Sequence, residues 1–176
     1  MKNRKQILSS VLILSACLSP LTVPVMVQPS WAQSQDAQSQ ELLKLIEQVD
    51  RLQKQGKHPQ AIETWQQILA TAQKVKNREL EGIALNAIGL NYYVSSGLEE
   101  ALKYFNQALP IAREVGDRSE EASILENIGL VYQSMGQPQE AVKYYNQALA
   151  IARQIGDRTL EASILENIKA ANKTSE

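Results

Sequence analysis

A repeat of 40 residues constrains the fold of this chain more than any other feature of its sequence. Residues 81–120 match residues 121–160 at about half of their positions, and residues 41–80 form a more divergent copy. The segment 121–128 returns unchanged at 161–168. A repeat of this length is one supersecondary unit, and neighbouring copies must stack to bury a shared core. The sequence therefore predicts one continuous array of similar units.

Each copy contains two runs of apolar residues at helical spacing, joined by a short turn. In the third copy, the first run extends from Ile124 to Tyr132 and the second from Ala141 to Ala152. Both runs are long enough for several helical turns. We therefore interpret each copy as a helical hairpin.

Residues that favour helix ends stand between these runs. Gly97 and Gly136 lie in the turns inside two copies, and Gly116 and Gly156 suit the C-terminal ends of helices. Asp117 is placed to cap the helix that follows it. We predict an all-α fold of seven helices: three helical hairpins at residues 41–80, 81–120 and 121–160, a capping helix at 158–171 and a short tail at 172–176.

The spacing of small, apolar and aromatic residues resembles the signature of the tetratricopeptide repeat. In the third copy the matching residues are Leu125, Ile128, Gly129, Tyr132, Ala141, Tyr145 and Ala148. The resemblance extends over residues 41–171, and the 40-residue length is similar to the longer variant of kinesin light chains and bacterial peptide-sensing regulators. It implies a right-handed superhelix whose first helices, one from each hairpin, line a concave groove that binds a peptide.

The resemblance also implies which residues line that groove. Asparagines on its wall often bond to the backbone of the bound peptide, and the matching residues here are Asn127 and Asn167. An amide offers both a donor and an acceptor, which suits backbone recognition. The predicted groove residues are Asn86, Leu90, Tyr93, Ser123, Glu126, Asn127, Leu130, Gln133, Ser163, Glu166 and Asn167.

Residues 1–32 have the layout of a secretory signal peptide. Three bases and no acid lie within residues 1–6, and residues 7–27 are uncharged and mostly apolar. Small residues favour cleavage after Ala32. Two alternatives stay open: Cys17 follows a lipoprotein-like sequence and could be acylated, or the leader could remain as an uncleaved anchor. Each alternative predicts an exported domain, either in the periplasm or secreted, or anchored to a membrane and facing out of the cytoplasm.

The part of the chain after the leader carries a modest negative charge. The chain has 18 bases and 19 acids, and three of the bases lie in the leader. Fifteen bases then remain against 19 acids, a net charge of about −4. This balance argues against nucleic acid or anionic lipid as a ligand and suits a basic protein or peptide. Residues 33–40 are polar and aperiodic, so we predict a disordered spacer there.

The sequence contains no recognisable catalytic or cofactor-binding motif. The histidine His58 lies beside Pro59 in a predicted turn, and the cysteine Cys17 lies in the leader. No glycine-rich phosphate loop, zinc-ligand spacing or nucleophilic serine motif occurs. The neighbouring carboxylates Glu120 and Glu121 would point about 100° apart on a helix, so we expect both to be solvated. We predict no enzyme activity, no cofactor and no metal site.

These observations favour an adaptor or scaffold that holds another polypeptide in the groove of the array. Two alternatives stay open. The repeats could self-associate as a structural protein, or the protein could be an envelope lipoprotein scaffold acylated at Cys17. The membrane would then be contacted through the leader alone. The sequence does not identify the partner.

Overall fold

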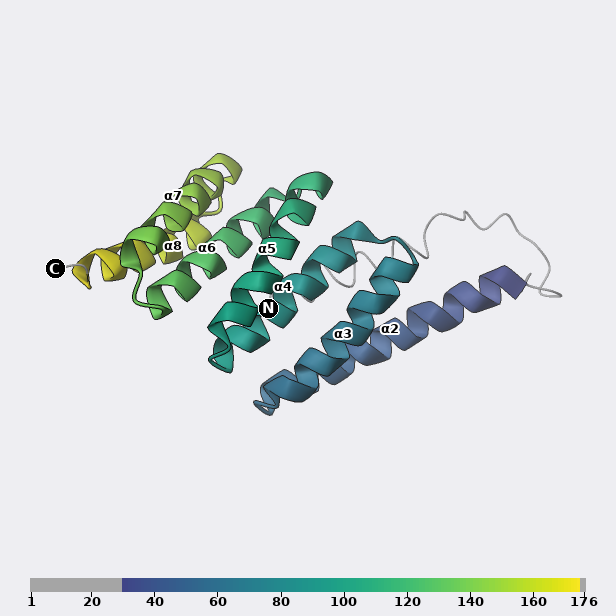
Figure 1. Ribbon diagram of the computed structural model, residues 1–176. Helices are drawn as coiled ribbons and strands as arrows, with labels where there is room; N and C mark the ends of the chain where they lie inside the picture. The colour runs from purple at the N-terminus through teal and green to yellow at the C-terminus, as the bar shows by residue number, and fades with distance from the viewer. Residues whose placement is uncertain (1–29, 175–176) are drawn as a thin grey trace.

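The computed structural model describes residues 30–174, which form seven α-helices and no β-strand. The helices are α2 (Ser30–Lys54), α3 (His58–Lys74), α4 (Arg78–Val94), α5 (Leu98–Val115), α6 (Arg118–Ser134), α7 (Pro138–Ile155) and α8 (Arg158–Lys173). Figure 1 shows them as three antiparallel hairpins, α2/α3, α4/α5 and α6/α7, arranged side by side and followed by α8. The predicted all-α hairpin array is confirmed. The predictions for the leader up to residue 29, including Cys17, lie outside the described residues.

The helices that begin the second, third and fourth units share one type of cap. Asp117 Oδ1 accepts a hydrogen bond from the backbone N–H of Glu120 at 2.9 Å, and Asn77 and Asp157 make the same bond at the starts of α4 and α8. The preceding helix α5 is capped at its C-terminal end by Gly116, whose φ of 74° is left-handed. The predicted caps at Gly116 and Asp117 are confirmed, and they start each unit directly after the one before it.

Gly97 lies in the turn between α4 and α5, as expected, but it is not the left-handed residue of that turn. The left-handed residue is Ser96, with φ 62°, whereas Gly97 has φ −85°. A left-handed conformation costs a residue with a side chain about 1 kcal/mol. Gly97 serves close packing instead, because a Cβ atom there would lie 3.0 Å from Cδ1 of Tyr92. The glycine therefore lets the turn pass close to Cδ1 of Tyr92.

The second and third hairpins pack their two helices around a glycine on the first helix and an aromatic ring on the second. A Cβ atom on Gly89 would lie 2.6 Å from Cε1 of Phe105, and one on Gly129 would overlap the ring of Tyr145. Both rings are fully buried. The close approach of the helices thus requires glycine at these two positions, as the repeat pattern predicts.

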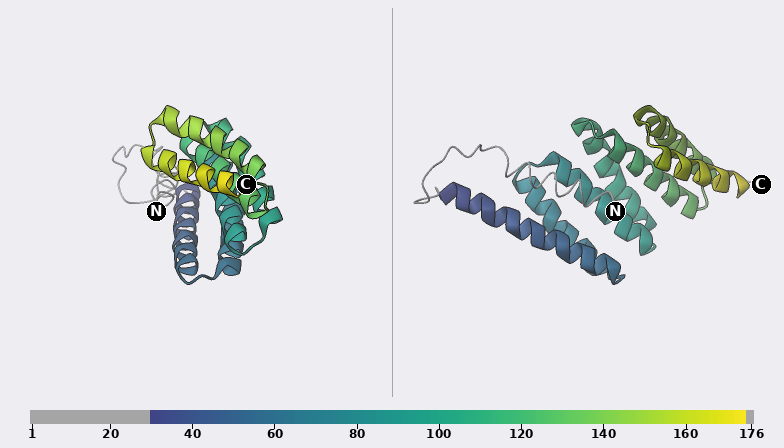
Figure 2. Two further views of the ribbon diagram at one scale, coloured as in Figure 1. Left: turned by 90° about the vertical axis from the view of Figure 1, so that its left-hand side faces the viewer. Right: turned by 180° about the vertical axis from the view of Figure 1, so that it is seen from behind.

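The helix α2 is longer than its partner, with 25 residues against 17 in α3. It includes residues 33–40, which corrects the prediction of a disordered spacer there. Leu42 and Ile46 anchor α2 in the core, and a helix that is already nucleated adds one hydrogen bond for each further residue. Alanine and glutamine in this stretch favour that growth. Figure 2 shows α2 extending beyond the other helices at its N-terminal end.

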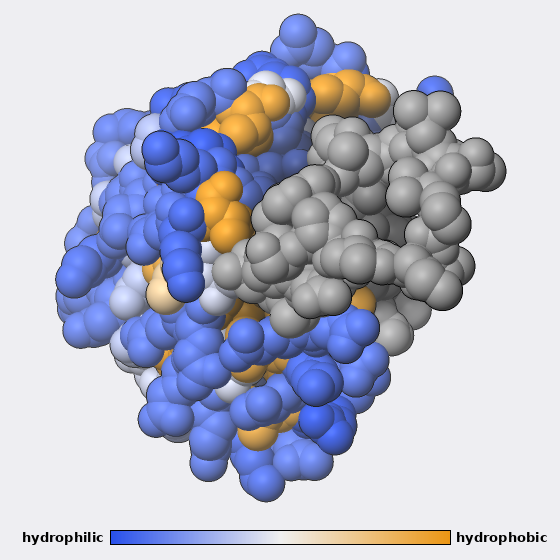
Figure 3. Space-filling view, turned by 90° about the vertical axis from the view of Figure 1, so that its right-hand side faces the viewer, coloured by the Kyte–Doolittle hydropathy of each residue, from blue (hydrophilic) through white to orange (hydrophobic). Residues whose placement is uncertain are grey.

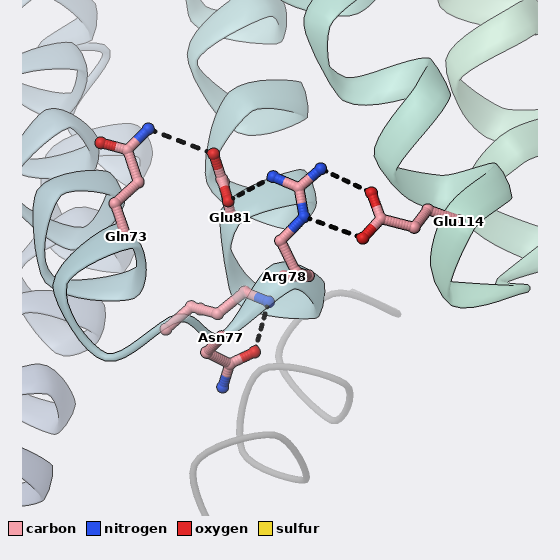
Figure 4. Close-up of polar contacts among 6 residues, drawn as sticks. Gln73, Asn77, Arg78, Glu81 and Glu114 are labelled. Carbon is pink, nitrogen blue, oxygen red and sulfur yellow. Dashed lines mark hydrogen bonds and ion pairs between the residues drawn. The ribbon is translucent and has the colours of Figure 1, made fainter.

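Ion pairs at repeated positions lie at the starts of α4 and α6, the first helices of the second and third hairpins. Arg78 pairs with Glu81 on its own helix at 2.7 Å and with Glu114 on α5 at 2.6 Å (Figure 4). One repeat later, Arg118 pairs with Glu121. Glu121 is 4% exposed, which corrects the expectation that it is solvated. Its charge can be buried because arginine neutralises it.

The last helix leaves part of its outer face uncovered. Leu165 on α8 is 42% exposed, whereas Leu85 and Leu125, at the same repeat position, are buried under the next hairpin. Lys169 and Asn172 are also exposed, as expected for a capping helix. Figure 3 shows the opposite end of the array, where α2 and α3 lie; this face is mainly hydrophilic, and its apolar side chains form small separate patches. Within residues 30–174, no helix combines the length and the apolar character needed to cross a membrane.

Candidate functional site

The helices α4, α6 and α8 form one continuous layer of the array. The middle helix α6 contacts both α4 and α8, whereas α3, α5 and α7 do not contact one another. An array bends toward the layer whose members lie closest together, so these three helices line its inner side. We call the face that they turn toward this inner side the A-helix wall. It consists of the predicted groove residues Asn86, Leu90 and Tyr93 on α4, Ser123, Glu126, Asn127, Leu130 and Gln133 on α6, and Ser163, Glu166 and Asn167 on α8.

A chain of hydrogen bonds joins α4 to α6. Asn86 Nδ2 donates to Glu120 Oε1 at 2.7 Å, and Asn127 Nδ2 donates to Asn86 Oδ1 at 3.1 Å. Asn86 is 2% exposed and Glu120 7% exposed. Burial raises the pKa of Glu120 to about 6, although the hydrogen bond from Asn86 opposes this rise. Asn86 is therefore too deeply buried to meet a ligand, and it holds the half-buried Asn127 in place.

The same arrangement returns between α6 and α8. Asn167 Nδ2 donates to Glu126 Oε1 at 2.8 Å, and Ser163 Oγ donates to the same oxygen at 2.7 Å. Burial raises the pKa of Glu126, and the two hydrogen bonds oppose the rise. Glu126 occupies the repeat position of Asn86. Asn127 on α6 is thus oriented by Asn86 on α4, and Asn167 on α8 by Glu126 on α6.

The amides of Asn127 and Asn167 retain unused hydrogen-bonding capacity. Each donates one hydrogen bond within the wall, and neither carbonyl oxygen accepts one from another residue of the described part of the chain. A side-chain amide has two hydrogens and an acceptor oxygen. Both residues are half-buried, so part of each amide remains accessible. The wall therefore presents two amides at equivalent repeat positions, and hydrogen bonds to Asn86 and Glu126 fix their orientation.

A second group of polar side chains lies toward the C-terminal ends of α4 and α6. The hydroxyl oxygens of Tyr93 and Ser134 lie 3.3 Å apart, and either hydroxyl can donate. Gln133 Oε1 accepts a hydrogen bond from the Tyr145 hydroxyl at 2.7 Å, and burial raises the pKa of Tyr145. Tyr93 is half-buried, which leaves part of its ring available as an apolar contact. Gln133 is partly occupied by its bond to the core tyrosine.

The remaining wall residues differ in what they can contact. Leu90 and Leu130 are half-buried and pack against the core, so they contribute apolar edges to the wall. Glu166 is exposed on α8 and offers a carboxylate. Together with the amides and Tyr93, these residues suit non-covalent binding of a polypeptide. Within residues 30–174, no cluster of histidine, cysteine, aspartate and glutamate could hold a metal ion.

Sequence reasoning missed Glu120, which we expected to be solvated. Its carboxylate is instead buried and anchors the hydrogen-bond chain through Asn86. A comparison of the copies could have revealed this burial, because the repeat position of Glu120 is occupied by leucine in the neighbouring copies, at Leu80 and Leu160. A charged residue in a position that is otherwise leucine points to a buried polar network.

The sequence matches a model of one protein family at three overlapping places. The family is described as tetratricopeptide repeat, and the matches cover residues 51–114, 84–154 and 120–174. They extend from the end of α2 to the end of α8. No curated protein matches the sequence.

Several solved structures share the architecture. BtubC (BKLC) from P. vanneervenii superposes with a TM-score of 0.70, covering 99% of this chain and 67% of that one at 18% identity. The apo form of RapI has a TM-score of 0.70, covering 98% of this chain and 59% of that one at 15% identity. A putative kinesin light chain from Podospora anserina with nearly identical repeats has a TM-score of 0.55, covering 99% and 97% at 17% identity. At such low identities the likeness shows the fold alone.

Proposed function

Because the chain belongs to the tetratricopeptide-repeat family, we propose that it is a non-enzymatic adaptor that binds a peptide segment of another protein along the A-helix wall. Repeats of this family bind proteins or peptides, and the fold generally serves as a scaffold rather than a catalyst. The shape and residues of the wall decide what it can hold.

The pair of oriented amides at Asn127 and Asn167 carries this proposal. Hydrogen bonds to Asn86 and Glu126 fix each amide before a ligand arrives, which lowers the entropy lost on binding. An extended peptide presents backbone N–H and C=O groups at regular intervals, and a fixed amide can pair with both. The wall would then bind the peptide backbone with little dependence on its sequence.

The charge of the wall favours a peptide with basic side chains. Glu126 and Glu166 lie on neighbouring helices, and the part of the chain after the leader is acidic. Burial raises the pKa of Glu126, which means that its charged form is poorly solvated. A lysine or arginine of the ligand would stabilise that charge.

A photocrosslinking experiment tests the proposal. With p-benzoylphenylalanine in place of Ser163, we expect one discrete polypeptide to be crosslinked; the same substitution at Asn146, exposed on α7, should not capture it.

The double variant Asn127→Ala, Asn167→Ala should weaken binding of that partner about thirtyfold, because each lost hydrogen bond is worth about 1 kcal/mol. Titration of the purified partner, monitored by fluorescence anisotropy, measures the change.

A matched control comes from the second helices of the hairpins. Asn106 and Asn146 are exposed and also 40 residues apart, on α5 and α7. The double variant Asn106→Ala, Asn146→Ala should bind the partner as tightly as the wild type. Equal losses in both double variants, with unchanged helicity by circular dichroism, would rule out the A-helix wall as the binding surface.

Self-association is a second candidate function, and the uncovered face of α8 favours it. Leu165 is exposed there although its repeat counterparts are buried. A second copy of the chain could cover this face and continue the array. In the photocrosslinking experiment, this function predicts that the crosslinked polypeptide is the protein itself.

We propose that the domain acts outside the cytoplasm, on the basis of the signal-peptide pattern in residues 1–32. Mass spectrometry of the protein isolated from its source cells should find Gln33 at the mature N-terminus. An acylated Cys17 would favour the envelope lipoprotein scaffold instead. An intact Met1 on protein from the cytosol would contradict export.

A further inference from the structure

A cleft of about 420 Å³ lies between α3 and the beginning of α5. Its lining includes Ile62 and Glu63 on α3, Tyr92 and Ser95 at the end of α4, and Gly97 and Glu100 at the start of α5. None of these residues belongs to the A-helix wall. The start of α3 and the turn between α4 and α5 lie near each other at the lower edge of the array in Figure 1, and residues from both line the cleft. The cleft is therefore separate from the site proposed above.

The cleft exists because two side chains of the repeat are small at this place. Ser95 occupies the position of Met135 in the next copy, and Gly97 occupies that of Gln137. Met135 packs against the core in the third hairpin. The first boundary between hairpins thus lacks the bulk that the next copy carries, and it leaves room for a side chain from outside.

The cleft also carries an unusual negative charge. Glu63 stands where the later copies have Lys103 and Lys143, so one base is replaced by an acid. In the third hairpin Glu140 pairs with Lys143 at 2.5 Å, but Glu100, at the same position as Glu140, has no ion-pair partner among the described residues. Glu63 also has no ion-pair partner among the described residues. Two unpaired carboxylates therefore line one cleft.

An aromatic ring lines the cleft together with these carboxylates. Tyr92 stacks on Tyr104 with ring centroids 5.5 Å apart, which fixes its orientation. A Cβ atom on Gly97 would lie 3.0 Å from Cδ1 of Tyr92 and 3.7 Å from Oε2 of Glu100, so the Glu100 carboxylate lies close to the ring. Burial raises the pKa of Tyr92, and the neighbouring Tyr104 and Glu100 raise it further. A cation in the cleft would meet a tyrosine ring and two carboxylates together.

We propose that this cleft binds an arginine side chain of a partner polypeptide. The flat guanidinium group can stack on the ring of Tyr92 while its N–H groups pair with Glu63 and Glu100. The aliphatic part of the arginine side chain would contact Ile62, and the small residues Ser95 and Gly97 leave room for it in the cleft. The site would give a partner a second point of attachment, outside the wall, and its existence does not depend on the proposed function of the wall.

Nuclear magnetic resonance of the ¹⁵N-labelled full-length protein tests this inference, with the peptide acetyl-Gly-Ala-Arg-Ala-Gly-amide as the probe. The backbone amide signals of Gly97 and Glu100 should shift and saturate with peptide concentration. The same peptide with glutamine in place of arginine should give no saturable shift. Absence of a saturable shift with the arginine peptide, or shifts at Asn127 and Asn167 instead, would overturn the proposal.

Variants of the chain separate the cleft from general electrostatic attraction. The double variant Glu63→Gln, Glu100→Gln should weaken binding of the arginine peptide at least tenfold, and Ser95→Met should block it by restoring the bulk of Met135. Glu99→Gln removes an exposed charge next to Glu100 but outside the lining, so it should leave the affinity unchanged. If Glu99→Gln weakens binding as much as the double variant does, the cleft is not the site.

Discussion

Gly129→Ala is expected to destabilise the protein by about 2 kcal/mol. The added Cβ atom would overlap the ring of Tyr145, which is fully buried and cannot swing into solvent. Overpacking of this kind costs about 3 kcal/mol, and the better helix propensity of alanine returns about 1 kcal/mol. For a domain of this size, the midpoint of thermal unfolding should fall by about 4–8 °C. Thermal and urea unfolding followed by circular dichroism would measure both quantities.

A double-mutant cycle identifies the cause of this loss. Tyr145→Leu leaves space opposite residue 129, so Gly129→Ala should cost much less in that background than in the wild type. An equal cost in both backgrounds would mean that the ring is not what requires glycine. The first hairpin shows that the requirement is local, because Val49 and Trp65 occupy these positions there and both are buried.

The hairpin array could be predicted from the sequence because its determinants are local and occur in every copy. The cap at Asp117 and the left-handed Gly116 follow from residue type and spacing alone. The exceptions arise where one copy departs from the pattern. The left-handed residue of the turn falls at one repeat position in every copy, at Gly56, Ser96 and Gly136, and only the second copy lacks glycine there.

The candidate site could be predicted only in part. Position in the repeat placed Asn127 and Asn167 on one wall, but it did not show that Asn86 is buried beneath Asn127. The same holds for the cleft beside Tyr92, which depends on the absence of bulk at Ser95. Such features are differences between copies, whereas a repeat signature records only what the copies share.

Glu120→Gln should stabilise the protein at pH 7.5 by up to about 2 kcal/mol. Burial raises the pKa of Glu120 from its ordinary value of 4.5 to about 6, so the charged carboxylate is less stable in the fold than in the unfolded chain. Each pH unit of that difference corresponds to about 1.4 kcal/mol. Glutamine removes the charge and keeps an oxygen that can accept the hydrogen bond from Asn86.

The expected gain depends on pH in a defined direction. Between pH 4.5 and 6, the folded wild type binds more protons at residue 120 than the unfolded chain does. The contribution of Glu120 to stability is therefore fully present below pH 4.5 and is lost as the pH rises through 6. The difference in unfolding free energy between Glu120→Gln and wild type should be near zero at pH 4 and reach its full value by pH 7. Urea unfolding at a series of pH values measures this difference.

Glu120→Leu separates the effect of charge from that of the hydrogen bond. Leucine is the residue at the same repeat position in Leu80 and Leu160, so it suits the local packing. It also removes the charge, but it leaves the buried Asn86 amide without its acceptor, which costs about 1–3 kcal/mol. Leucine should therefore yield less stability than glutamine at pH 7.5. If leucine stabilises the protein as much as glutamine does, the hydrogen bond between Asn86 and residue 120 contributes nothing to stability. The orientation of Asn127 would then not depend on residue 120.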